Sequence, residues 1–442
     1  MDVLIITDTF APYNSCGSIP NTKLIKYLAR EDLRLTLLTI DVMPGMPVDY
    51  SLLPDEMDRI TTYRMRHSKL YLKTVNALRQ NAKKSGTTLK MKTEKRPLRA
   101  RAISKIMDLY YSFEKKDLYR SGTRIIRKHL MNKHFDIVYS SYPSAAAHVL
   151  ARYAMDHHVA NKWVADFRDP MAYMEFFSDE YERALNFQHQ LERAADHVVV
   201  VSEGAMDKFR FDDIPESKLS YLPNGYDPED FHSEPLKAHS TDSVLHFFYA
   251  GSLYAGKRDL TVLFRALADL SEEGKIDLQK IKVEYAGNEF PILQEFAGKY
   301  HLELLCVDYG YVPRHRVMEI MSDIDVTLVC THNTQADKGV VTGKIFELLL
   351  VGKPILAVIT GDLPDSELAG IVKACHAGFV YEEVCGDRDY SELKRWLLSL
   401  YEQKLSAGYV SSGIDTAAME QYSYSNIAKK LYGIFEQLMN NG

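Results

Sequence analysis

The stretch VLIITDT at residues 3–9 is an apolar run that ends in polar residues, which is the pattern of a buried strand leading into a loop. A loop with two prolines follows, then a helical spacing of apolar residues at 21–30 and a second apolar run at 35–40. Strand, loop, helix and strand in this order are typical of a βαβ unit, whose two strands lie parallel in one sheet. The chain is therefore predicted to begin with an α/β domain.

The same order of elements recurs along the rest of the chain. In the first half, the pattern predicts strands at 135–140, 163–165 and 198–201, and helices at 144–157 and 181–195. In the second half, it predicts strands at 246–250, 282–286, 326–329 and 354–359, and helices at 261–270 and 426–440. Residues 226–243 between the halves are polar and show little periodicity, so we interpret them as an interdomain linker.

These patterns predict an α/β protein with two Rossmann-like domains that face a central cleft. Residues 1–228 form the first domain, with a basic insertion at about 61–133, and residues 244–415 form the second. Residues 416–442 form a C-terminal helix that is expected to pack back on the N-terminal domain. Ligands of such sheets bind outside the carboxyl ends of the strands, so the loops after the strands are the candidate sites.

The composition is that of a globular enzyme with material for more than one core. Of the 442 residues, 46% are hydrophobic and 26% are charged. The five cysteines are widely spaced and form no CxxC pair, so we expect neither a disulfide framework nor a zinc site, and a reducing compartment is the simpler interpretation. The sequence shows no signal peptide and no apolar run of spanning length, so a cytoplasmic protein is expected.

Basic residues are concentrated in one segment. Residues 61–133 hold 21 Lys or Arg and 4 Asp or Glu, whereas the rest of the chain holds 33 and 56. This separation of charge usually serves a partner surface. The apolar residues at 103–113 beside the basic run suit an anionic membrane, which would place the protein on its inner face, and a solvated loop is the alternative. Nucleic acid is disfavoured because no nucleic-acid motif accompanies the run and the whole protein is acidic.

Two segments of the second half combine glycines with cations. Residues 250–258 follow a predicted strand and contain Gly251, Ser252, Lys257 and Arg258. The glycines permit close backbone approach, and the two cations suit a diphosphate whose leaving charge is neutralised without metal. A solvated Lys-Arg pair is the alternative.

The second segment, residues 341–349, is predicted to open a helix at Gly343 and Lys344. A helix N-terminus is electropositive and suits phosphate. Glu347 lies one turn further, where a carboxylate can take two hydroxyls of a ribose. A helix-stabilising surface Glu is the alternative.

The first half offers a polar cluster and a loop. Residues 163–170 end a predicted strand with Arg168 and Asp169. Asp169 could accept or orient the proton of an acceptor hydroxyl and Arg168 could bind a carboxylate or phosphate, with a structural Asp–Arg network as the alternative. The first loop, which contains Gly17 and Ser18, could aim backbone N–H groups at an anion or be an ordinary turn.

Together these segments resemble the family 4 glycosyltransferases of the GT-B fold. The segments that carry the resemblance are 344–347 with 352–354, the loop 251–257, and the stretches 286–288 and 309–312. Residues 165–170 look like the corresponding segment of bacterial members that act on surface polysaccharides. The segments stand in the right order from residue 1 to about residue 360.

The resemblance implies a retaining hexosyltransferase type of enzyme. It would move a sugar from a nucleoside-diphosphate sugar to a glycan or lipid-linked acceptor in cell-surface polysaccharide biosynthesis. Glu347 would hold the nucleotide ribose, and Lys257 would contact the diphosphate together with amides near Gly17 and Lys344.

The remaining roles follow from the same resemblance. The backbone around Tyr311 and Val312 would face the base, while Asp169 and Arg168 would face the transferred sugar or the acceptor. The donor phosphate itself would assist the incoming hydroxyl. The nucleotide-sugar is then a substrate, and we expect no cofactor and no metal.

Three features depart from the family pattern, and one is a His that the family often has near the sugar in the first domain, where this chain offers Asp169. The family often has Arg five residues before the loop lysine, where this chain has Ser252. It also has a Glu eight residues before Glu347, where this chain has Gly339. Two alternatives therefore stay open: a GT-B sugar-nucleotide epimerase, and a non-catalytic nucleotide-sugar-binding subunit.

Overall fold

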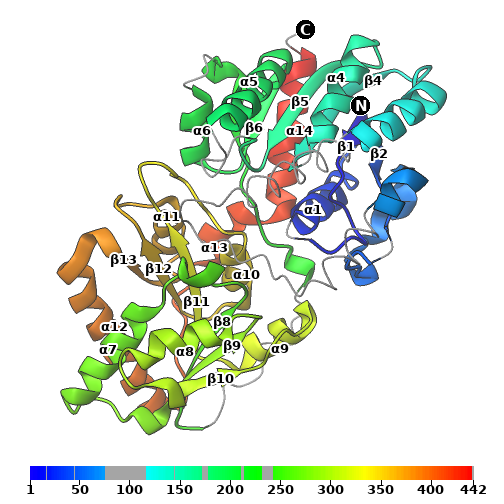
Figure 1. The fold of residues 1–442 in the computed structure, drawn as a ribbon. Helices are drawn as coiled ribbons and strands as arrows, with labels where there is room; N and C mark the ends of the chain where they lie inside the picture. Colours follow the sequence, from blue (N-terminus) through cyan, green and yellow to red (C-terminus); the bar gives the residue numbers. More distant parts are fainter. Residues whose placement is uncertain are drawn as a thin grey trace. The chain divides into compact units, whose positions relative to one another are not determined.

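The computed structural model describes residues 1–15, 17–43, 45–74, 116–143, 145–171, 178–210, 214–230 and 242–440. Contacts divide the chain into two compact units. Unit 1 comprises Met1–Val201, Phe209–Leu222 and Ala428–Gly442, and unit 2 comprises Ser202–Lys208 and Pro223–Ile427. Each unit contains one sheet, and every pair of neighbouring strands in the two described sheets is parallel. The prediction of two parallel α/β sheets is confirmed (Figure 1).

The sheet of unit 1 has seven strands in the order β3-β2-β1-β4-β5-β6-β7. The strands are β1 (Asp2–Ile6), β2 (Arg34–Ile40), β3 (Ile60–Met65), β4 (Phe135–Tyr142), β5 (Ala160–Phe167), β6 (His197–Val200) and β7 (Leu219–Tyr221). The helices of this unit are α1 (Ser18–Leu28), α4 (Ala145–Asp156), α5 (Ser178–Ala194) and most of α14 (Tyr424–Asn440), whereas most of α6 (Glu203–Arg210) belongs to unit 2. The central strands are apolar on both faces because helices cover both faces of a parallel sheet.

The basic segment at 61–133 does not begin as an insertion. Residues 61–65 belong to β3, the edge strand of the sheet, which pairs with β2. The sequence pattern gave no sign of this strand because its polar residues, such as Thr61 and Arg64, interrupt the apolar run. An edge strand tolerates such residues because it has only one hydrogen-bonded neighbour. Residues 75–115 of the segment lie outside the described residues.

The C-terminal helix α14 contributes to the core of unit 1. Its residues from Ala428 onward cluster with that unit. Phe435 is buried and lies edge-on to Tyr139 of β4, with 6.1 Å between the ring centres. Leu431 is buried on the same helix.

The sheet of unit 2 has six strands in the order β10-β9-β8-β11-β12-β13. The strands are β8 (Leu245–Ala250), β9 (Ile281–Ala286), β10 (Cys306–Asp308), β11 (Val326–His332), β12 (Ile355–Thr360) and β13 (Gly378–Glu382). The helices are α7 (Thr261–Glu272), α8 (Phe290–Gly298), α9 (Arg314–Asp323), α10 (Lys344–Val351), α11 (Glu367–Ala374), α12 (Gly386–Ala407) and α13 (Thr416–Met419).

The sheet of unit 2 separates two hydrophobic cores, one on each of its faces. On β8, Phe247 and Tyr249 enter the core formed with α7, α8 and α12, whereas Phe248 enters the core formed with α10 and α11. Alternate residues of a strand point to opposite faces, so one apolar run serves both cores.

A buried ion pair ties the amino-terminal edge of this sheet to α12. The Lys404 ammonium lies 3.0 Å from Oδ1 of Asp325, and both side chains are inaccessible to solvent. Oδ2 of Asp325 accepts the backbone N–H of His246 at 3.0 Å. Asp325 therefore has a structural role at the start of β11.

His246 itself lies in a charged network on the face of the sheet. Its Nδ1 contacts Glu284 and its Nε2 lies 3.2 Å from Asp242. Glu284 also accepts a hydrogen bond from the Tyr309 hydroxyl at 2.6 Å. Burial alone would lower the pKa of His246, but the two carboxylates outweigh it and the pKa is raised.

This network predicts a pH-dependent stability of unit 2. A raised pKa in the folded state means that the charged pair stabilises below the unfolded pKa of His246, and that this contribution is lost as pH rises through the folded value. We expect His246→Gln to lower the melting temperature at pH 5.5 and to flatten its decline between pH 6 and pH 8. Thermal unfolding monitored across this range tests it. His315→Gln, at an exposed position, is the matched control, and an unchanged pH profile in His246→Gln would contradict the assignment.

Candidate functional site

In the sheet of unit 2, β8 and β11 are neighbours, but the chain continues from β8 to β9 on one side and from β11 to β12 on the other. The strand order therefore reverses between β8 and β11, and this place is the topological switch point of the sheet. Such a point is where parallel α/β sheets bind ligands. The loop after β8 contains residues 251–257, and the segment after β11 leads into α10 at Lys344. The two sequence segments with glycines and cations therefore flank one position in the fold.

Lys344 and Gly251 meet at this point. The Lys344 ammonium donates a hydrogen bond to the carbonyl of Ala250 at 2.7 Å and lies 5.1 Å from the centre of the Tyr249 ring. Gly251 has a φ of +115°, and a Cβ at this residue would lie 2.0 Å from the Lys344 Nζ. The φ of Gly251 favours glycine at this position, and a side chain there would have to displace the Lys344 ammonium.

Arg258 joins the same group. Its Nη1 lies 3.5 Å from the Tyr249 hydroxyl and 3.4 Å from the Ser252 carbonyl. Burial raises the pKa of the Cys330 thiol on β11 to about 12, and both Arg258 and Lys344 oppose this rise. Lys344 and Arg258 therefore both lie beside Tyr249.

Lys257 occupies a different part of the loop. Its backbone N–H donates to the carbonyl of Tyr254 and closes the short helical turn Tyr254–Gly256. Its side chain is exposed. The next residue, Arg258, is the one whose guanidinium contacts the Tyr249 hydroxyl.

Glu347 is held by an arginine that sequence reasoning did not single out. Arg314, the first residue of α9, donates from Nε and Nη2 to Oε1 of Glu347 at 3.1 and 3.0 Å. The same Nη2 lies 3.1 Å from Oδ2 of Asp230. Burial would lower the pKa of Arg314, but the two carboxylates outweigh it and raise the pKa. Both hydrogen bonds from Arg314 go to Oε1 and hold the Glu347 side chain in place. The other carboxylate oxygen, Oε2, takes no part in these two bonds.

The backbone of the loop after β8 surrounds the carboxylate of Glu289. Oε2 accepts the N–H groups of Leu253 and Tyr254 at 2.7 and 3.1 Å, and Oε1 accepts that of Ala255 at 3.0 Å. The Ser252 hydroxyl donates to Oε2 at 2.5 Å. Three consecutive amides of this loop therefore face an anion of the chain itself.

The residues expected around the base lie at the surface. Tyr311 is 77% exposed, and Val312 packs at the edge of the core that contains α10. Gly343 is exposed as the residue before α10. The loop after β9 reaches this region because the N–H of Gly287 donates to the carbonyl of Gly310 at 2.9 Å.

The resemblance leads one to expect a glutamate at position 339, and the packing around Gly339 explains why the chain has glycine there. Its φ is +70°, and a Cβ there would lie 2.6 Å from Cα of Gly204 and 2.9 Å from the Ser202 hydroxyl. The first turn of α6 fills this space. A glutamate cannot be placed at position 339 without moving that turn.

In unit 1 the switch point lies between β1 and β4. Gly17 precedes α1 there, where a Cβ would lie 3.4 Å from Thr9 and 3.6 Å from Pro143. Ser18 is buried, and its hydroxyl pairs with that of Ser15 at 2.7 Å. The Ser18 hydroxyl is thus used within the loop, so a ligand here would meet backbone groups.

Behind this loop, Asp166 of β5 organises a buried network. Its Oδ2 accepts hydrogen bonds from Tyr139, from Ser141 at 3.2 Å and from Nε of Arg168 at 2.8 Å. The Ser141 hydroxyl also donates to Asn21 at 3.0 Å. Nη1 of Arg168 approaches the Leu222 carbonyl at 3.4 Å. Arg168 therefore has partners inside unit 1.

Asp169 differs from its neighbour Arg168. The residue is exposed, yet the protein around its carboxyl group desolvates it and raises its pKa to about 6, and the charge of Arg168 acts in the opposite direction. A carboxyl group with a pKa near neutrality is suited to proton exchange.

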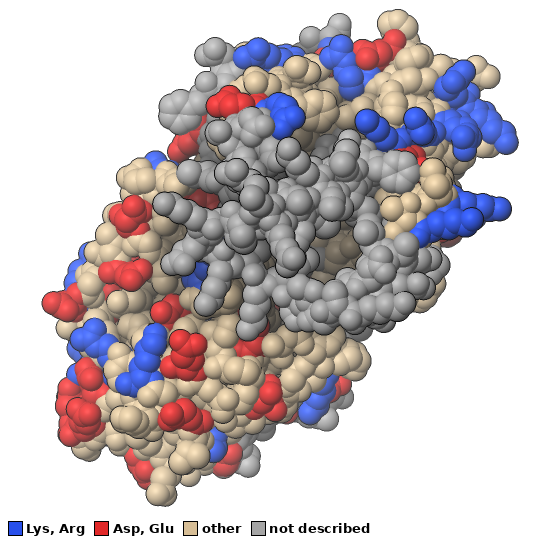
Figure 2. Space-filling model, in the orientation of Figure 1, with Lys and Arg blue, Asp and Glu red and all other residues tan. Residues whose placement is uncertain are grey.

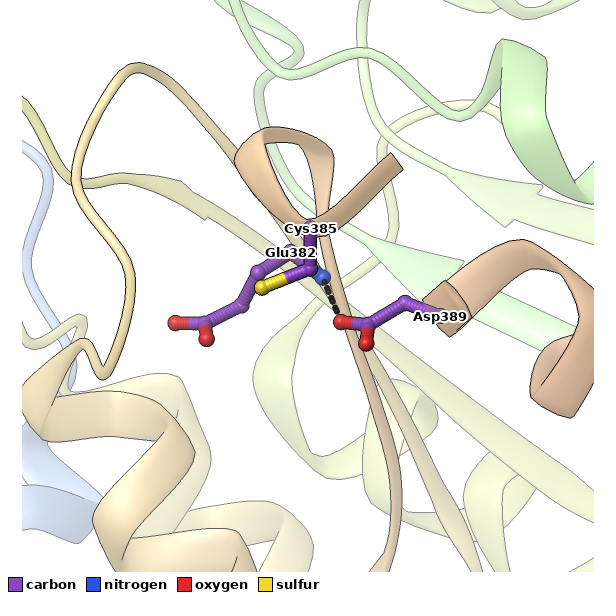
Figure 3. A group of neighbouring side chains, drawn as sticks. All are labelled: Glu382, Cys385 and Asp389. Atoms are coloured by element: carbon purple, nitrogen blue, oxygen red, sulfur yellow. Dashed lines mark hydrogen bonds between the residues drawn. The ribbon is translucent and has the colours of Figure 1, made fainter. Parts of the chain in front are cut away.

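One group of side chains in the described residues has the spacing of metal ligands: Glu382, Cys385 and Asp389 (Figure 3). Both Glu382 oxygens accept backbone N–H groups, from Asp365 at 3.0 Å and Ser366 at 2.8 Å. Asp389 accepts the N–H of Glu382 at 3.0 Å. These bonds fix the turn before α11 and the start of α12, which is a structural role.

Arg314 and Glu289 were missed because their partners are distant in sequence. Glu289 follows the stretch 286–288 that carries part of the resemblance, and Arg314 follows Pro313 at a helix start. In the sequence, each of them is only a charged residue near the start of a helix. Charged residues at such positions are common and do not by themselves indicate a function.

Comparisons with known proteins agree with this architecture. Residues 91–230 match the sequence model of Glycosyltransferase Family 4. The search of curated proteins gave no match. Among solved structures, the chain is similar to sucrose-phosphate synthase from Thermosynechococcus elongatus, with a TM-score of 0.62, 12% identity and full coverage of both chains.

Two further structures show the range of the fold. HepE from Anabaena, in complex with UDP-glucose, has a TM-score of 0.58 at 14% identity, covering 99% of this chain and 100% of HepE. A putative UDP-N-acetylglucosamine 2-epimerase from Listeria monocytogenes has a TM-score of 0.53 at 11% identity, covering 100% of this chain and 97% of the epimerase. As the sequence resemblance predicted, the chain has the GT-B fold over its length, and its residues 91–230 match the Glycosyltransferase Family 4 model.

Proposed function

We propose that this protein is a retaining glycosyltransferase. It transfers a hexose from a nucleoside-diphosphate sugar to a glycan or lipid-linked acceptor in cell-surface polysaccharide biosynthesis. The observation that carries the proposal is the meeting of Lys344, Gly251 and Arg258 at the switch point of unit 2, with Glu347 one turn further along α10. The complex of HepE with UDP-glucose supports a nucleotide-sugar donor.

The diphosphate is proposed to bind over the first turn of α10. The ammonium of Lys344 and the guanidinium of Arg258 provide positive charge there, and Lys257 adds a third cation on the same loop. As the glycosidic bond breaks, negative charge accumulates on the leaving diphosphate, and fixed cations stabilise it more than they stabilise the intact donor.

The nucleoside is proposed to lie between Glu347 and the surface at Tyr311 and Val312. Arg314 fixes Glu347 through Oε1, which leaves the second oxygen to accept ribose hydroxyls. Two hydrogen bonds from Arg314 to the same oxygen hold the Glu347 side chain in place, so less entropy is lost when the ribose binds.

Acceptor chemistry is assigned to Asp169. Its pKa of about 6 leaves it mostly ionised at neutral pH and able to accept or orient the hydroxyl proton of the acceptor. Arg168 beside it limits the rise of this pKa.

A sugar-nucleotide epimerase is the second candidate, favoured by the structural likeness to the putative epimerase from Listeria monocytogenes. It would use the same donor groups but need no acceptor. Incubating the protein with UDP-N-acetylglucosamine in the absence of acceptor separates the two, because an epimerase changes the sugar while a transferase leaves it unchanged or hydrolyses it slowly.

Donor binding is tested by thermal stabilisation with UDP and a panel of UDP-, GDP- and ADP-sugars. A ligand at 100 times its dissociation constant adds about 2.7 kcal/mol to the stability of the folded state. We expect at least one of them to raise the melting temperature, and Glu347→Gln and Lys344→Met to reduce or abolish the rise. Glu402→Gln on the exposed side of α12 is the matched control. Stabilisation that survives both site variants would remove this site from donor binding.

The role of Asp169 is tested by the pH profile of sugar transfer or donor hydrolysis. Since the carboxylate is the active form, kcat/KM should fall as pH drops through about 6. Asp169→Asn should remove this acid limb and lower the rate by about 10²–10⁴-fold. The exposed Asp32→Asn in the same unit is the control. A profile that is the same in both variants would exclude Asp169 from proton transfer.

The basic surface of unit 1 is proposed to contact an anionic membrane. The exposed cations described there are Arg66, Lys69, Lys73, Lys116, Arg120, Arg124, Arg127, Lys128 and Lys133. Figure 2 shows blue side chains gathered over the segments of unit 1 that Figure 1 draws in blue and cyan. Among the described helices, none combines the length and apolar character needed to cross a bilayer.

Replacing Arg124, Arg127 and Lys128 with Gln should weaken binding to phosphatidylserine-containing vesicles, because each cation near such a surface contributes about 1 kcal/mol. Sedimentation with these vesicles at low and high salt provides the measurement. Replacing Lys299, Lys373 and Arg395 of unit 2 gives a matched loss of charge. Equal binding of the two triple variants would show that this surface is not the contact.

A further inference from the structure

The loop after β8 closes around a single carboxylate. Glu289, just before α8, accepts four hydrogen bonds from four consecutive residues: the Ser252 hydroxyl and the N–H groups of Leu253, Tyr254 and Ala255. Consecutive N–H groups that converge in this way form an anion-binding concavity. This is the loop whose following residues, Lys257 and Arg258, carry the cations of the proposed donor site.

The loop adopts a conformation that its own residues do not favour. Tyr254 and Ala255 have φ values of +50° and +54° although neither is glycine. Non-glycine residues are strained in this region and keep such a conformation only when surrounding contacts hold them. Hydrogen bonds to an ionised carboxylate are about twice as strong as neutral ones, so Glu289 supplies contacts of the required strength.

Glu289 is itself held from the strand side. The Tyr285 hydroxyl of β9 accepts the N–H of Glu289 at 3.1 Å and donates to the carbonyl of Gly251 at 2.8 Å. Tyr285 therefore links Gly251, the first residue of the loop, to Glu289, whose carboxylate the loop surrounds. Desolvation alone would raise the pKa of Glu289, but the hydrogen bonds from Ser252 and the three amides outweigh it, so the pKa is lowered and the group is ionised at neutral pH.

We propose that Glu289 is a positioning residue that holds residues 251–257 in the shape required for donor binding. The inference rests on the proposed function of the same site. Because three amides of the loop already serve Glu289, the loop presents its cations, rather than its backbone, to the diphosphate. Glu289 acts through Arg258 and Lys257 and does not touch the donor.

The first arm of the test needs no ligand. Hydrogen–deuterium exchange of the full chain should show the amides of residues 253–255 exchanging at least about tenfold faster in Glu289→Ala than in the unchanged protein. Glu289→Gln keeps the length and one acceptor oxygen, so its exchange should be intermediate. Glu295→Ala, at an exposed position on α8, removes an equal charge from the helix that follows Glu289 and should leave the exchange as it was.

The second arm measures UDP binding by calorimetry on the same four proteins. Loss of preorganisation should weaken UDP about tenfold in Glu289→Ala and less in Glu289→Gln, with no change in Glu295→Ala. Melting temperatures identify any variant that loses its global fold. A merely structural role would speed the exchange and leave the affinity for UDP unchanged, which would overturn the proposal.

Two other results of the UDP titration would be interpreted differently. Tighter UDP binding in Glu289→Ala would show that the carboxylate competes with the phosphates and is displaced by them, which also overturns it. If the unchanged protein binds neither UDP nor UDP-glucose, the proposed function fails and the positioning role fails with it, whereas the exchange arm still reports whether Glu289 holds the loop.

Discussion

Each strand of both sheets runs parallel to its neighbours, so every strand delivers its carboxyl end to the same edge of its sheet. The chain must then return across a face through a helix, and the loop at that edge is free of the pairing that constrains the strand. This constraint explains why segments as distant as residues 251–257 and Lys344 lie together in unit 2. It also explains why Gly17 lies close to Pro143 in unit 1.

Much of this architecture was predictable because buried parallel strands are apolar on both faces and are bounded by turn residues. The runs at 246–250 and 354–359 became β8 and β12 almost unchanged. The edge strand β3 was missed because one of its sides lacks a partner, so polar residues such as Arg64 are tolerated there. The pattern of apolar residues identifies strands that are buried on both faces, and it misses strands such as β3 that are only partly buried.

The candidate site was predictable in part for a different reason. Glycines and cations after strands indicated Gly251 and Lys344, but the pattern could not show what their neighbours bind. Glu289 and Arg314 act on residues more than 30 positions away, and no periodicity relates such pairs. Gly339 shows the reverse case: the departure was visible in sequence, and its cause, the close approach of Gly204, required coordinates.

The helix α14 gives unit 1 an unusual order of assembly. The strands of its sheet are complete by Tyr221, yet Phe435 and Leu431 fill part of the core against them. During synthesis the first unit must therefore wait, with an apolar face uncovered, while all of unit 2 leaves the ribosome. Unit 2 has its own late partner in Lys404, and its part of the chain ends at Ile427. The half that is made second is thus the half that can finish folding first.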